Sequence, residues 1–212
     1  MKILGVKALS IPEIKVIRFA RFMDQRGYFT ETYRDTDLNG IGELVSLSKA
    51  VFHQANESFS RAGTIRGMHF QWNPYMGKLV RTVSGRMIDL VLDIRKGSLT
   101  FGCMIAYDMP SVREYDWGEW IWVPPGFAHG NVFTEDTVIE YMCTGQYNPK
   151  CEAGISPLAA DIDWRLCDRG LKAVFEETAK YSKLITDKDK GAVGVKGWAD
   201  DPRARNFDLK LL

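Results

Sequence analysis

Residues 66–95 carry side chains whose types and spacing could do proton-transfer chemistry. The stretch contains His69, which is one of only three histidines in the chain, together with Lys78 and Asp89. An imidazole exchanges a proton near neutral pH, and a lysine held by a carboxylate can stabilise an anion that forms beside it. Charged residues at strand positions where a core is expected therefore indicate one wall of an active site.

The relative positions of Lys78 and Asp89 depend on how residues 78–94 fold. Ser84-Gly85 favours a two-residue hairpin turn, and Val80 would then face Asp89. Lys78 and Asp89 would be diagonal neighbours on one face of the pair. The opposite face is apolar, with Leu79, Ile88, Leu90, Leu92 and Ile94. The pattern fits either an ion pair on a solvated face or a lysine held inside a barrel by a carboxylate.

Short strands at regular spacing surround this stretch. They are expected at 28–33, 50–55, 64–71, 78–83, 86–94, 101–107, 120–123, 131–134 and 137–143, with glycine and proline turns between them. This pattern predicts an all-β fold, a sandwich or barrel, over residues 1–165. Helical spacing predicts a helix at 169–183, and the charged tail 187–212 either packs as an arm or stays loose. Residues 166–212 are expected to pack on the same domain.

Two of the histidines lie in motifs typical of the cupin fold, a small jelly-roll β-barrel. Gly63 precedes His69 as in the first cupin motif, and residues 118–129 match most of the second, ending in His129. Metal-binding cupins have a second histidine and a glutamate in the first motif, whereas this chain has Gln71. Since two of the usual four ligands are missing, no bound metal is predicted.

Composition argues against several classes of protein. The chain has 212 residues and a formal net charge of +1 without a basic stripe, so no nucleic-acid binding is expected. No run of about 20 apolar residues is present, so no membrane span is expected. The four cysteines form no CxxC pair, which favours reduced thiols in a cytoplasmic protein. No glycine-rich dinucleotide motif follows a strand, so no redox cofactor is expected.

Several motifs, taken in order, resemble the dTDP-4-dehydrorhamnose 3,5-epimerase family. They are DQRGYF, RGMHFQ, GKLVR, DIRKGS, TFG, WVPPGFAHG and a later Tyr-x5-Tyr-x-Pro. The resemblance covers residues 10–165 and the Thr-Asp-Lys-Asp at 186–189. It implies a cupin-fold isomerase without a cofactor. Its substrate would be a nucleotide-diphospho-4-keto-6-deoxy sugar, inverted at C3, C5 or both through an enolate, in deoxysugar and polysaccharide biosynthesis.

The resemblance implies four catalytic residues. His69 is the implied base, and an ordinary histidine pKa of ~6.5 suits proton abstraction at neutral pH. Asp189 is implied to pair with His69, although Thr186 and Asp189 also have the spacing of a helix-capping pair. Lys78 is implied to stabilise the enolate oxygen. Tyr141 is implied to be the proton donor on the opposite face of the sugar.

The resemblance also implies a set of substrate-binding residues. They are Arg26, Phe29, Glu31, Gln54, Asn56, Arg66, Asp89 and His129. Arginines suit a diphosphate because a guanidinium donates several hydrogen bonds to phosphate oxygens. A neighbouring subunit contributes part of this set in the family, so a homodimer is implied.

Two departures from the family's sequence pattern leave the choice of substrate open. Gln146 stands where many family members have the first of two adjacent tyrosines, and the segment 166–186 is longer than usual. A single-site epimerase or ketoisomerase acting on a CDP- or GDP-linked keto sugar is therefore an alternative. A sugar-binding cupin without enzymatic activity is another. A metal-dependent dioxygenase is a third, and it would contain iron or nickel.

Overall fold

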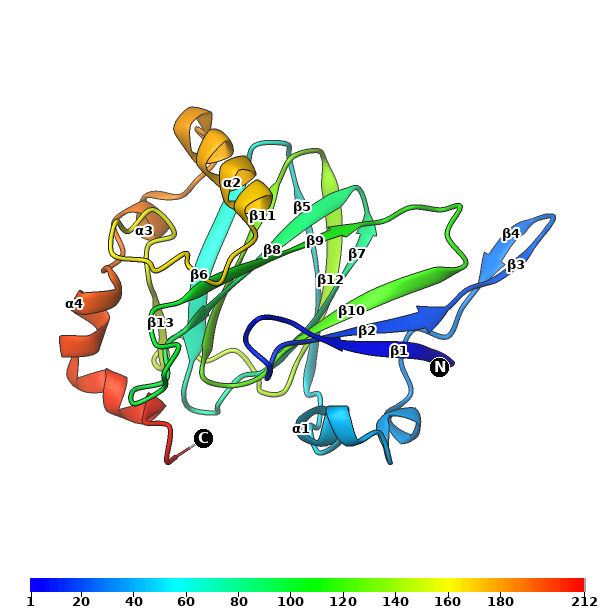
Figure 1. The fold of residues 1–212 in the computed structure, drawn as a ribbon, viewed down its shortest axis with the longest axis horizontal. Helices are drawn as coiled ribbons and strands as arrows, with labels where there is room; N and C mark the ends of the chain where they lie inside the picture. The colour runs from blue at the N-terminus through cyan, green and yellow to red at the C-terminus, as the bar shows by residue number, and fades with distance from the viewer. Residues whose placement is uncertain (212) are drawn as a thin grey trace.

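The structure is a computed structural model that describes residues 1–211, and it consists mainly of two β-sheets (Figure 1). The six-stranded sheet has the spatial order β1 (Ile3–Ala8), β2 (Lys15–Ala20), β10 (Trp117–Val123), β7 (Lys78–Ser84), β12 (Thr137–Cys143) and β5 (Gln54–Ser60). The five-stranded sheet has the order β13 (Glu152–Gly154), β6 (Ile65–Gln71), β11 (Phe127–Phe133), β8 (Arg86–Asp93) and β9 (Met104–Pro110). All neighbouring strands within these sheets run antiparallel.

The inner faces of the two sheets share one apolar core. Val80 and Ile139 of the six-stranded sheet belong to the same buried cluster as Val91 and Phe127 of the five-stranded sheet. Side chains alternate along a strand, so every second residue of β7 and β8 points into this space. The all-β jelly-roll class is confirmed. Within residues 1–211 the two sheets stay separate rather than joining into a closed barrel.

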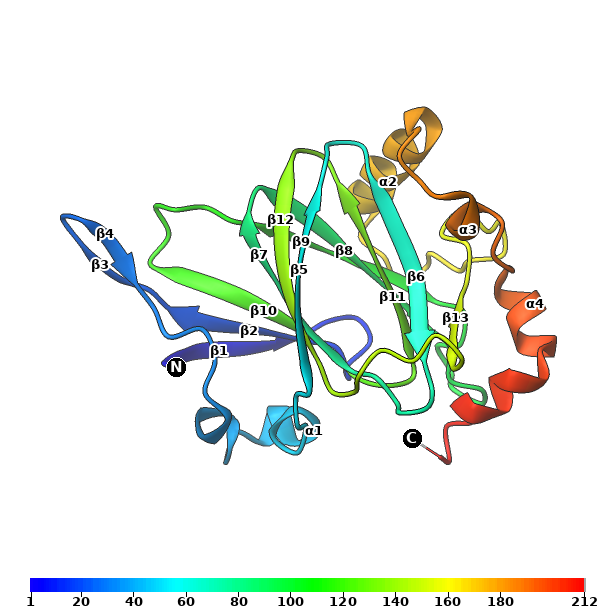
Figure 2. The same ribbon diagram turned by 180° about the vertical axis from the view of Figure 1, so that it is seen from behind.

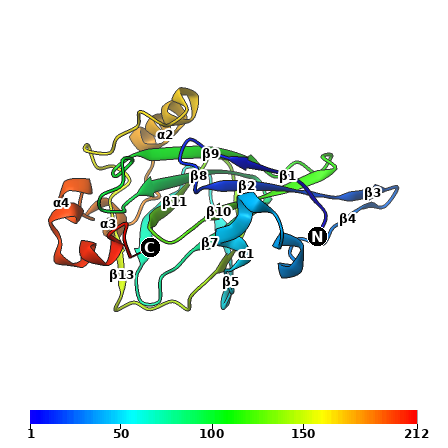
Figure 3. The ribbon, with the colours of Figure 1, turned by 60° about the horizontal axis from the view of Figure 1, so that its bottom comes forward.

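The outer face of the six-stranded sheet is covered by the segment between the N-terminal strands and β5. This segment contains η1 (Asp35–Leu38), η2 (Gly42–Leu44) and α1 (Val45–Ser48), with α1 below the sheet in Figure 1 and in front of it in Figure 3. Leu44 and Leu47 pack there in one cluster with Trp120 and Trp122. Residues 36–48 therefore close the outer side of the six-stranded sheet.

The outer face of the five-stranded sheet is covered by the C-terminal segments. These are α2 (Arg169–Tyr181), α3 (Asp187–Lys190), α4 (Val195–Asp200) and η3 (Pro202–Phe207). Figures 1 and 2 show them on the side of the molecule where β6 and β13 lie. Trp198 and Phe207 lie edge-on to Phe70 of β6. The expected helix at 169–183 is confirmed as α2. The tail is an arm that packs on the sheet, because its aromatic side chains complete an apolar cluster.

The expected hairpin of residues 78–94 is wrong. β7 pairs with β10 and β12, whereas β8 pairs with β9 and β11, so Ser84-Gly85 crosses from one sheet to the other. The predicted faces are nevertheless correct, because alternation depends on the local backbone and not on the partner strand. Lys78 and Asp89 both point into the space between the sheets, from opposite sheets rather than from one ladder.

Several strand ends also differ from the expected ranges. β11 begins at Phe127 rather than at residue 131, and β5 runs from Gln54 to Ser60 rather than ending at residue 55. The strand expected at 28–33 ends at Phe29. It belongs to a separate two-stranded ribbon, β3 (Phe22–Asp24) and β4 (Gly27–Phe29), which projects from the body in Figures 1 and 2. Among residues 1–211, no helix has the length and apolar character that a membrane crossing requires.

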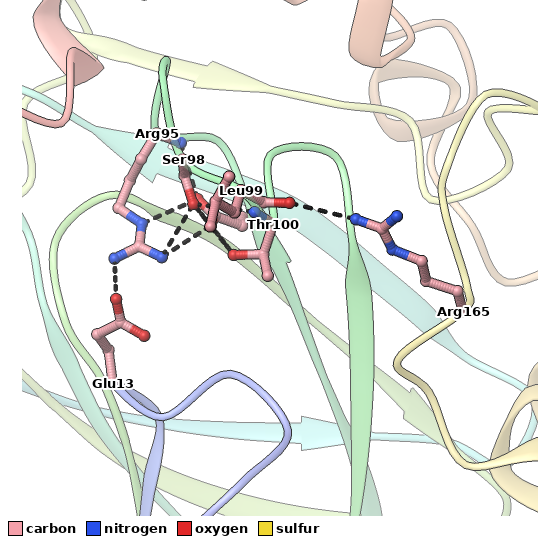
Figure 4. A network of polar contacts seen from close by, with 7 residues as sticks. Glu13, Arg95, Ser98, Leu99, Thr100 and Arg165 are labelled. Carbon is pink, nitrogen blue, oxygen red and sulfur yellow. Dashed lines mark hydrogen bonds and ion pairs between the residues drawn. The ribbon is translucent and has the colours of Figure 1, made fainter.

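A buried ionic network closes the end of β8. Arg95 donates hydrogen bonds to both carboxylate oxygens of Asp93 and pairs with Glu13 (Figure 4). The hydroxyls of Ser98 and Thr100 donate to the same aspartate at 2.7 and 2.6 Å. These contacts fix the turn that follows β8 and therefore the register of a strand that faces the inner space.

Candidate active site

A cavity of about 610 Å³ lies between the two sheets, and both sheets contribute to its wall. The six-stranded sheet supplies Ser58, Lys78 and Tyr141, and the five-stranded sheet supplies Arg66, His69 and His129. The connection from α2 to α3 closes one side. A recess of about 190 Å³ continues past His69, Lys78 and Tyr141 toward Gln54 and Tyr147. The cavity is thus lined by opposite walls that carry different ionisable groups.

His69 of β6 is paired with Asp189 of α3. The His69 Nε2 atom lies 2.8 Å from Asp189 Oδ1, and the aspartate side chain is only 6% exposed. A donor proton on Nε2 leaves Nδ1 as the nitrogen with a free lone pair. Burial lowers the pKa of His69, although the charge of Asp189 acts in the opposite direction. The imidazole is therefore neutral and able to accept a proton at neutral pH.

Thr186 caps the helix that carries this aspartate. Its hydroxyl accepts a hydrogen bond from the Asp189 backbone N–H at 3.1 Å. The capping pair expected from the sequence and the pairing of Asp189 with His69 are thus both present. The cap uses the backbone of Asp189, so its carboxylate remains available to His69.

The second histidine of the cavity has its own carboxylate. His129 Nε2 lies 2.7 Å from Asp89 Oδ2, and Asn131 Nδ2 donates to the same oxygen at 3.2 Å. Both residues of the pair are buried. The His129 ring is therefore fixed in orientation at the cavity wall, with Asp89 behind it.

Close approach of two strands brings the histidines together. His69 and His129 are partners in the pairing of β6 with β11. Next to them, a Cβ atom on Gly67 would lie 2.6 Å from the Gly130 Cα atom, and Gly67 has a φ of +102°. Only glycine combines that backbone angle with that contact. These glycines let both imidazoles face one cavity.

Lys78 is half-buried and reaches the cavity from the opposite sheet. Burial lowers the pKa of its ammonium, while the charges of Asp89 and Glu152 act against that effect. Within residues 1–211 its Nζ atom has no hydrogen-bond or ion-pair partner. An ammonium in this setting is available to an oxygen atom of a bound ligand.

Tyr141 lies next to Lys78 on the same sheet. Burial raises the pKa of its phenol, and the charge of Arg66 offsets part of that increase. The hydroxyl therefore keeps its proton through the neutral range and can donate it. Cys143, two residues further along β12, is a buried thiol whose pKa is likewise raised by burial.

Polar groups at the ends of the site come from Arg66, Gln54 and Asn56. Arg66 is exposed at the mouth, where its Nε donates to Ser60 Oγ at 2.8 Å. Gln54 Nε2 donates to Asn56 Oδ1 at 3.0 Å, and Asn56 contacts Cys143. All three were expected from the sequence, and the structure brings them to the same cavity system as the histidines.

Three other expected binding residues lie elsewhere. Arg26 and Phe29 are on the projecting β3–β4 ribbon, with the Phe29 side chain 72% exposed. Arg26 pairs with Asp24 at 2.6 Å, and Glu31 pairs with Arg34 at 2.6 Å. A single chain therefore does not bring these residues to its own cavity.

Sequence reasoning missed several residues that line the cavity. Ser58 follows Gln54 and Asn56 at strand spacing, so alternation alone could have found it. Lys183 comes from the C-terminal segment and carries no signal of its own, whereas Lys188 lies inside the matched motif at 186–189. No group of three or more histidine, cysteine or acidic side chains in the described chain is arranged to hold a metal ion.

Comparison with known proteins identifies relatives of the whole domain. The profile of the dTDP-4-dehydrorhamnose 3,5-epimerase family matches residues 8–196. A curated protein of that name from Sinorhizobium fredii is 39% identical over 163 residues, which covers 74% of this chain and 79% of the relative. Another from Pseudomonas aeruginosa is 33% identical over 185 residues, with 85% and 96% covered.

Solved structures agree with the family match. The dTDP-6-deoxy-D-glucose-3,5-epimerase of Legionella pneumophila, solved with dTDP-4-keto-L-rhamnose, is similar with a TM-score of 0.75 and 27% identity. The alignment covers 96% of this chain and 97% of that one. An epimerase from Mycobacterium tuberculosis gives a TM-score of 0.75 at 27% identity, with 99% and 100% covered.

Proposed function

The chain belongs to the dTDP-4-dehydrorhamnose 3,5-epimerase family, and on that premise we propose how its cavity inverts the sugar of its substrate. The protein is an isomerase of the epimerase type, and its substrate is a nucleotide-linked 4-keto-6-deoxy sugar. We propose inversion at both C3 and C5. The observation that carries this proposal is the position of a histidine with a buried aspartate partner on one wall and a tyrosine on the other.

His69 is the base of the proposed reaction. A C–H bond beside a ketone is a weak acid, so the base must be held against the carbon while the enolate forms. Nδ1 of His69 accepts the proton, and the electron pair of the C–H bond moves toward the C4 carbonyl oxygen. Asp189 stabilises the imidazolium that results, since it accepts the Nε2–H bond at 2.8 Å.

Lys78 and His129 serve the oxygen at C4. The Lys78 ammonium has no partner among residues 1–211, so it is free to donate to the developing enolate oxygen. Hydrogen-bond donors directed at a developing charge contribute most when water is excluded. His129, fixed by Asp89, lines the cavity beside the same oxygen.

Tyr141 returns a proton to the opposite face of the ring. It lies on β12 of the six-stranded sheet, whereas His69 lies on β6 of the five-stranded sheet. A sugar held between the sheets would present one face to each residue. Burial raises the pKa of Tyr141, which keeps the phenol protonated until the enolate carbon takes its proton.

The nucleotide is bound at the ends of the cavity and by a second subunit. Arg66 at the mouth suits the diphosphate, with Gln54 and Asn56 as further polar contacts. We propose a homodimer in which the projecting β3–β4 ribbon carries Arg26 and Phe29 to the partner's cavity. The four free cysteines fit the reducing cytoplasm, which we propose as the location.

We also propose that residues 1–165 and 166–212 work as one unit. Phe175, Trp198 and Phe207 lie in a single buried cluster with residues of β6, β8 and β11. The C-terminal segment also supplies Asp189 to the cavity. Removal of this segment would therefore take away both packing and a reacting group.

Proton NMR in deuterated water tests the proposed function. The protein is incubated with dTDP-, CDP- and GDP-linked 4-keto-6-deoxy sugars, and solvent deuterium is expected at both C3 and C5 of at least one. Deuterium at a single carbon would show a single-site epimerase instead. No exchange with any of these sugars would refute the enzymatic proposal. Turnover that is unchanged in His69→Ala would refute only the assignment of the base.

A further inference from the structure

Asn131 lies on β11 two residues beyond His129, so both side chains project from the same face of the strand. Its neighbours in the sheet are Arg66 of β6 and Asp89 of β8, and it lines the cavity between the sheets. Only 5% of Asn131 is exposed. A buried amide has both donor hydrogens and an acceptor oxygen, and each of them needs a partner.

The amide nitrogen of Asn131 has no hydrogen left for a ligand. Nδ2 donates one hydrogen bond to Asp89 Oδ2 at 3.2 Å and another to Met87 Sδ at 3.1 Å. An amide nitrogen has two hydrogens, so these two contacts use both. A flipped amide would place its oxygen against a carboxylate oxygen and a thioether sulfur, and neither of these can donate. The surroundings therefore fix the orientation of the side chain.

The amide oxygen of Asn131, in contrast, has no partner. Its Oδ1 atom accepts no hydrogen bond from any of residues 1–211, yet it is not closed off from open space in the way that Asp89 Oδ1 is. The open space that Asn131 adjoins is the cavity. The residue therefore presents an acceptor, and only an acceptor, to a molecule bound there.

The other groups of the cavity determine which donor fits this oxygen. Arg66 and Lys78 line the same cavity, so a ligand ammonium beside Asn131 would be repelled by like charges, whereas a hydroxyl donates without adding charge. Asp89 Oδ2 contacts both His129 and Asn131, at 2.7 and 3.2 Å, so these two side chains end next to each other. The hydroxyl must therefore lie beside the C4 oxygen, which the proposed function places at Lys78 and His129.

We propose that Asn131 is a specificity-determining residue whose Oδ1 atom accepts a hydrogen bond from the C3 hydroxyl of the sugar. This inference rests on the proposed function, because that function places the C4 oxygen beside His129. The two carbons next to C4 carry different groups in a 4-keto-6-deoxy sugar, namely a hydroxyl at C3 and a methyl at C5. A methyl beside Asn131 would leave the buried oxygen without a donor, which is unfavourable. The contact therefore directs C3 toward Asn131 and C5 away from it.

Calorimetry with matched sugars tests this contact without turnover. The probes are dTDP-, CDP- and GDP-linked 6-deoxyglucose, which has no carbonyl group and cannot form an enolate, and the same compounds without the C3 or the C2 hydroxyl. With the nucleotide that binds most tightly, the unchanged protein should bind the complete sugar about tenfold more tightly than the 3-deoxy sugar, as one hydrogen bond allows. In Asn131→Leu this ratio should fall to about one, because the acceptor is gone.

The use of paired sugars separates the hydroxyl contact from an effect through Asp89. Asn131→Leu also removes a donor from Asp89, which changes the surroundings of His129, but that loss applies equally to both sugars. Asn131→Ala is the second variant if thermal unfolding shows that Asn131→Leu does not fold. Asn206→Leu is the matched control, since the amide of Asn206 donates to the Arg203 carbonyl at 2.8 Å on η3. Its ratio should equal that of the unchanged protein.

The outcomes separate this inference from the proposed function. If the unchanged protein binds the complete and the 3-deoxy sugar equally, or if Asn131→Leu keeps the ratio, Asn131 does not bind the C3 hydroxyl. A ratio that falls in the variant only for the 2-deoxy sugar would place the contact at C2 and would equally overturn the inference. Absence of deuterium exchange with every 4-keto sugar overturns the proposed function, whereas the affinity ratio still tests the contact. Failure to bind any of these sugars would overturn both.

Discussion

Asp89 and Asp93 lie four positions apart on β8, face the same inner space and are both fully buried, yet their surroundings differ. Both oxygens of Asp93 accept hydrogen bonds, from Arg95, Ser98 and Thr100. Asp89 Oδ2 accepts from His129 and Asn131, but its Oδ1 has no partner among residues 1–211. Buried polar atoms are rarely left this way.

The difference separates a structural carboxylate from a functional one. Arg95 stays protonated at every ordinary pH and fills its hydrogen bonds within the turn, so the network around Asp93 can only hold the chain in place. The charge of Asp89 acts on the ammonium of Lys78, whose pKa is lowered by burial and which has no partner among residues 1–211. Incomplete pairing is therefore what leaves the cavity able to react.

The largest expected effect is on turnover, from Lys78→Met. Removal of the ammonium should lower kcat by about 10²–10³, as loss of one donor to an anionic intermediate does. Stability should not decrease, because the variant no longer buries an ammonium without a partner. Turnover by NMR and thermal unfolding check both parts. A variant that keeps its kcat would show that Lys78 is not needed for the enolate.

Asp93→Asn should have the next largest effect, on stability. Breaking a buried, hydrogen-bonded pair should cost about 3 kcal/mol in the free energy of unfolding measured with urea, because Arg95 loses its buried counter-charge and keeps only the more exposed Glu13. The kcat of the folded enzyme should not change. If the variant unfolds at the same urea concentration as the parent, the network does not contribute to the stability of the fold.

The same substitution should change the acid dependence of stability. Burial raises the pKa of Asp93, but the hydrogen bonds from Arg95, Thr100 and Ser98 outweigh it, and the pKa lies below the ordinary value. Such a group stabilises the fold fully above its unfolded pKa of ~3.9, and the stabilisation is lost as pH falls through the folded pKa. Asp93→Asn should therefore flatten the loss of stability below about pH 4.

Asp89→Asn should affect turnover rather than stability, and its effects should be smaller than those of Lys78→Met and Asp93→Asn. Stability should change by less than about 1 kcal/mol, since an amide still accepts from His129. The charge of Asp89 counteracts the effect of burial on the pKa of Lys78, so its loss should move the alkaline limb of the rate profile to lower pH. We expect kcat to fall at alkaline pH, because less of the Lys78 ammonium is then protonated. A stability loss as large as that of Asp93→Asn would contradict the distinction between the Asp89 and Asp93 carboxylates.

The smallest expected effect concerns the acidic limb of the pH–rate profile of the unchanged enzyme. His69 must be neutral to accept a proton, and burial lowers its pKa. The profile of kcat/KM against pH should therefore stay level down to a pH below ~6.5 before activity falls. A limb at or above that value would mean that Asp189 dominates over burial, which would place the ring in a more polar setting.

The sequence predicted much of the cavity, because its signals are local. Alternation placed Lys78 and Asp89 on the inner faces of their strands, and the spacing around His69 and His129 identified barrel-corner motifs. The same reasoning failed for the partner of β7. Ser84-Gly85 has the composition of a hairpin turn, but a turn of this kind also permits a crossing between sheets, and the core packing of both faces decides between them.

The residues around Asp189 could not be found in this way. Lys188 and Glu152 belong to segments without a periodic pattern, and their contact exists only because β13 pairs with β6 while α3 packs beside it. Arg26 and Phe29 could be assigned to the site from the motif, yet the fold of one chain places them on a projecting ribbon.

The sequence by itself determined the all-β class, the candidate reacting side chains and the strand faces that Lys78 and Asp89 occupy. Those properties follow from backbone alternation and short motifs, which act over a few residues. Only the tertiary structure decided that Lys78 and Asp89 face one space from two different sheets, and that Asp189, 120 residues beyond His69, reaches it at 2.8 Å. Such contacts depend on which apolar faces pack together, and that choice involves the whole chain at once.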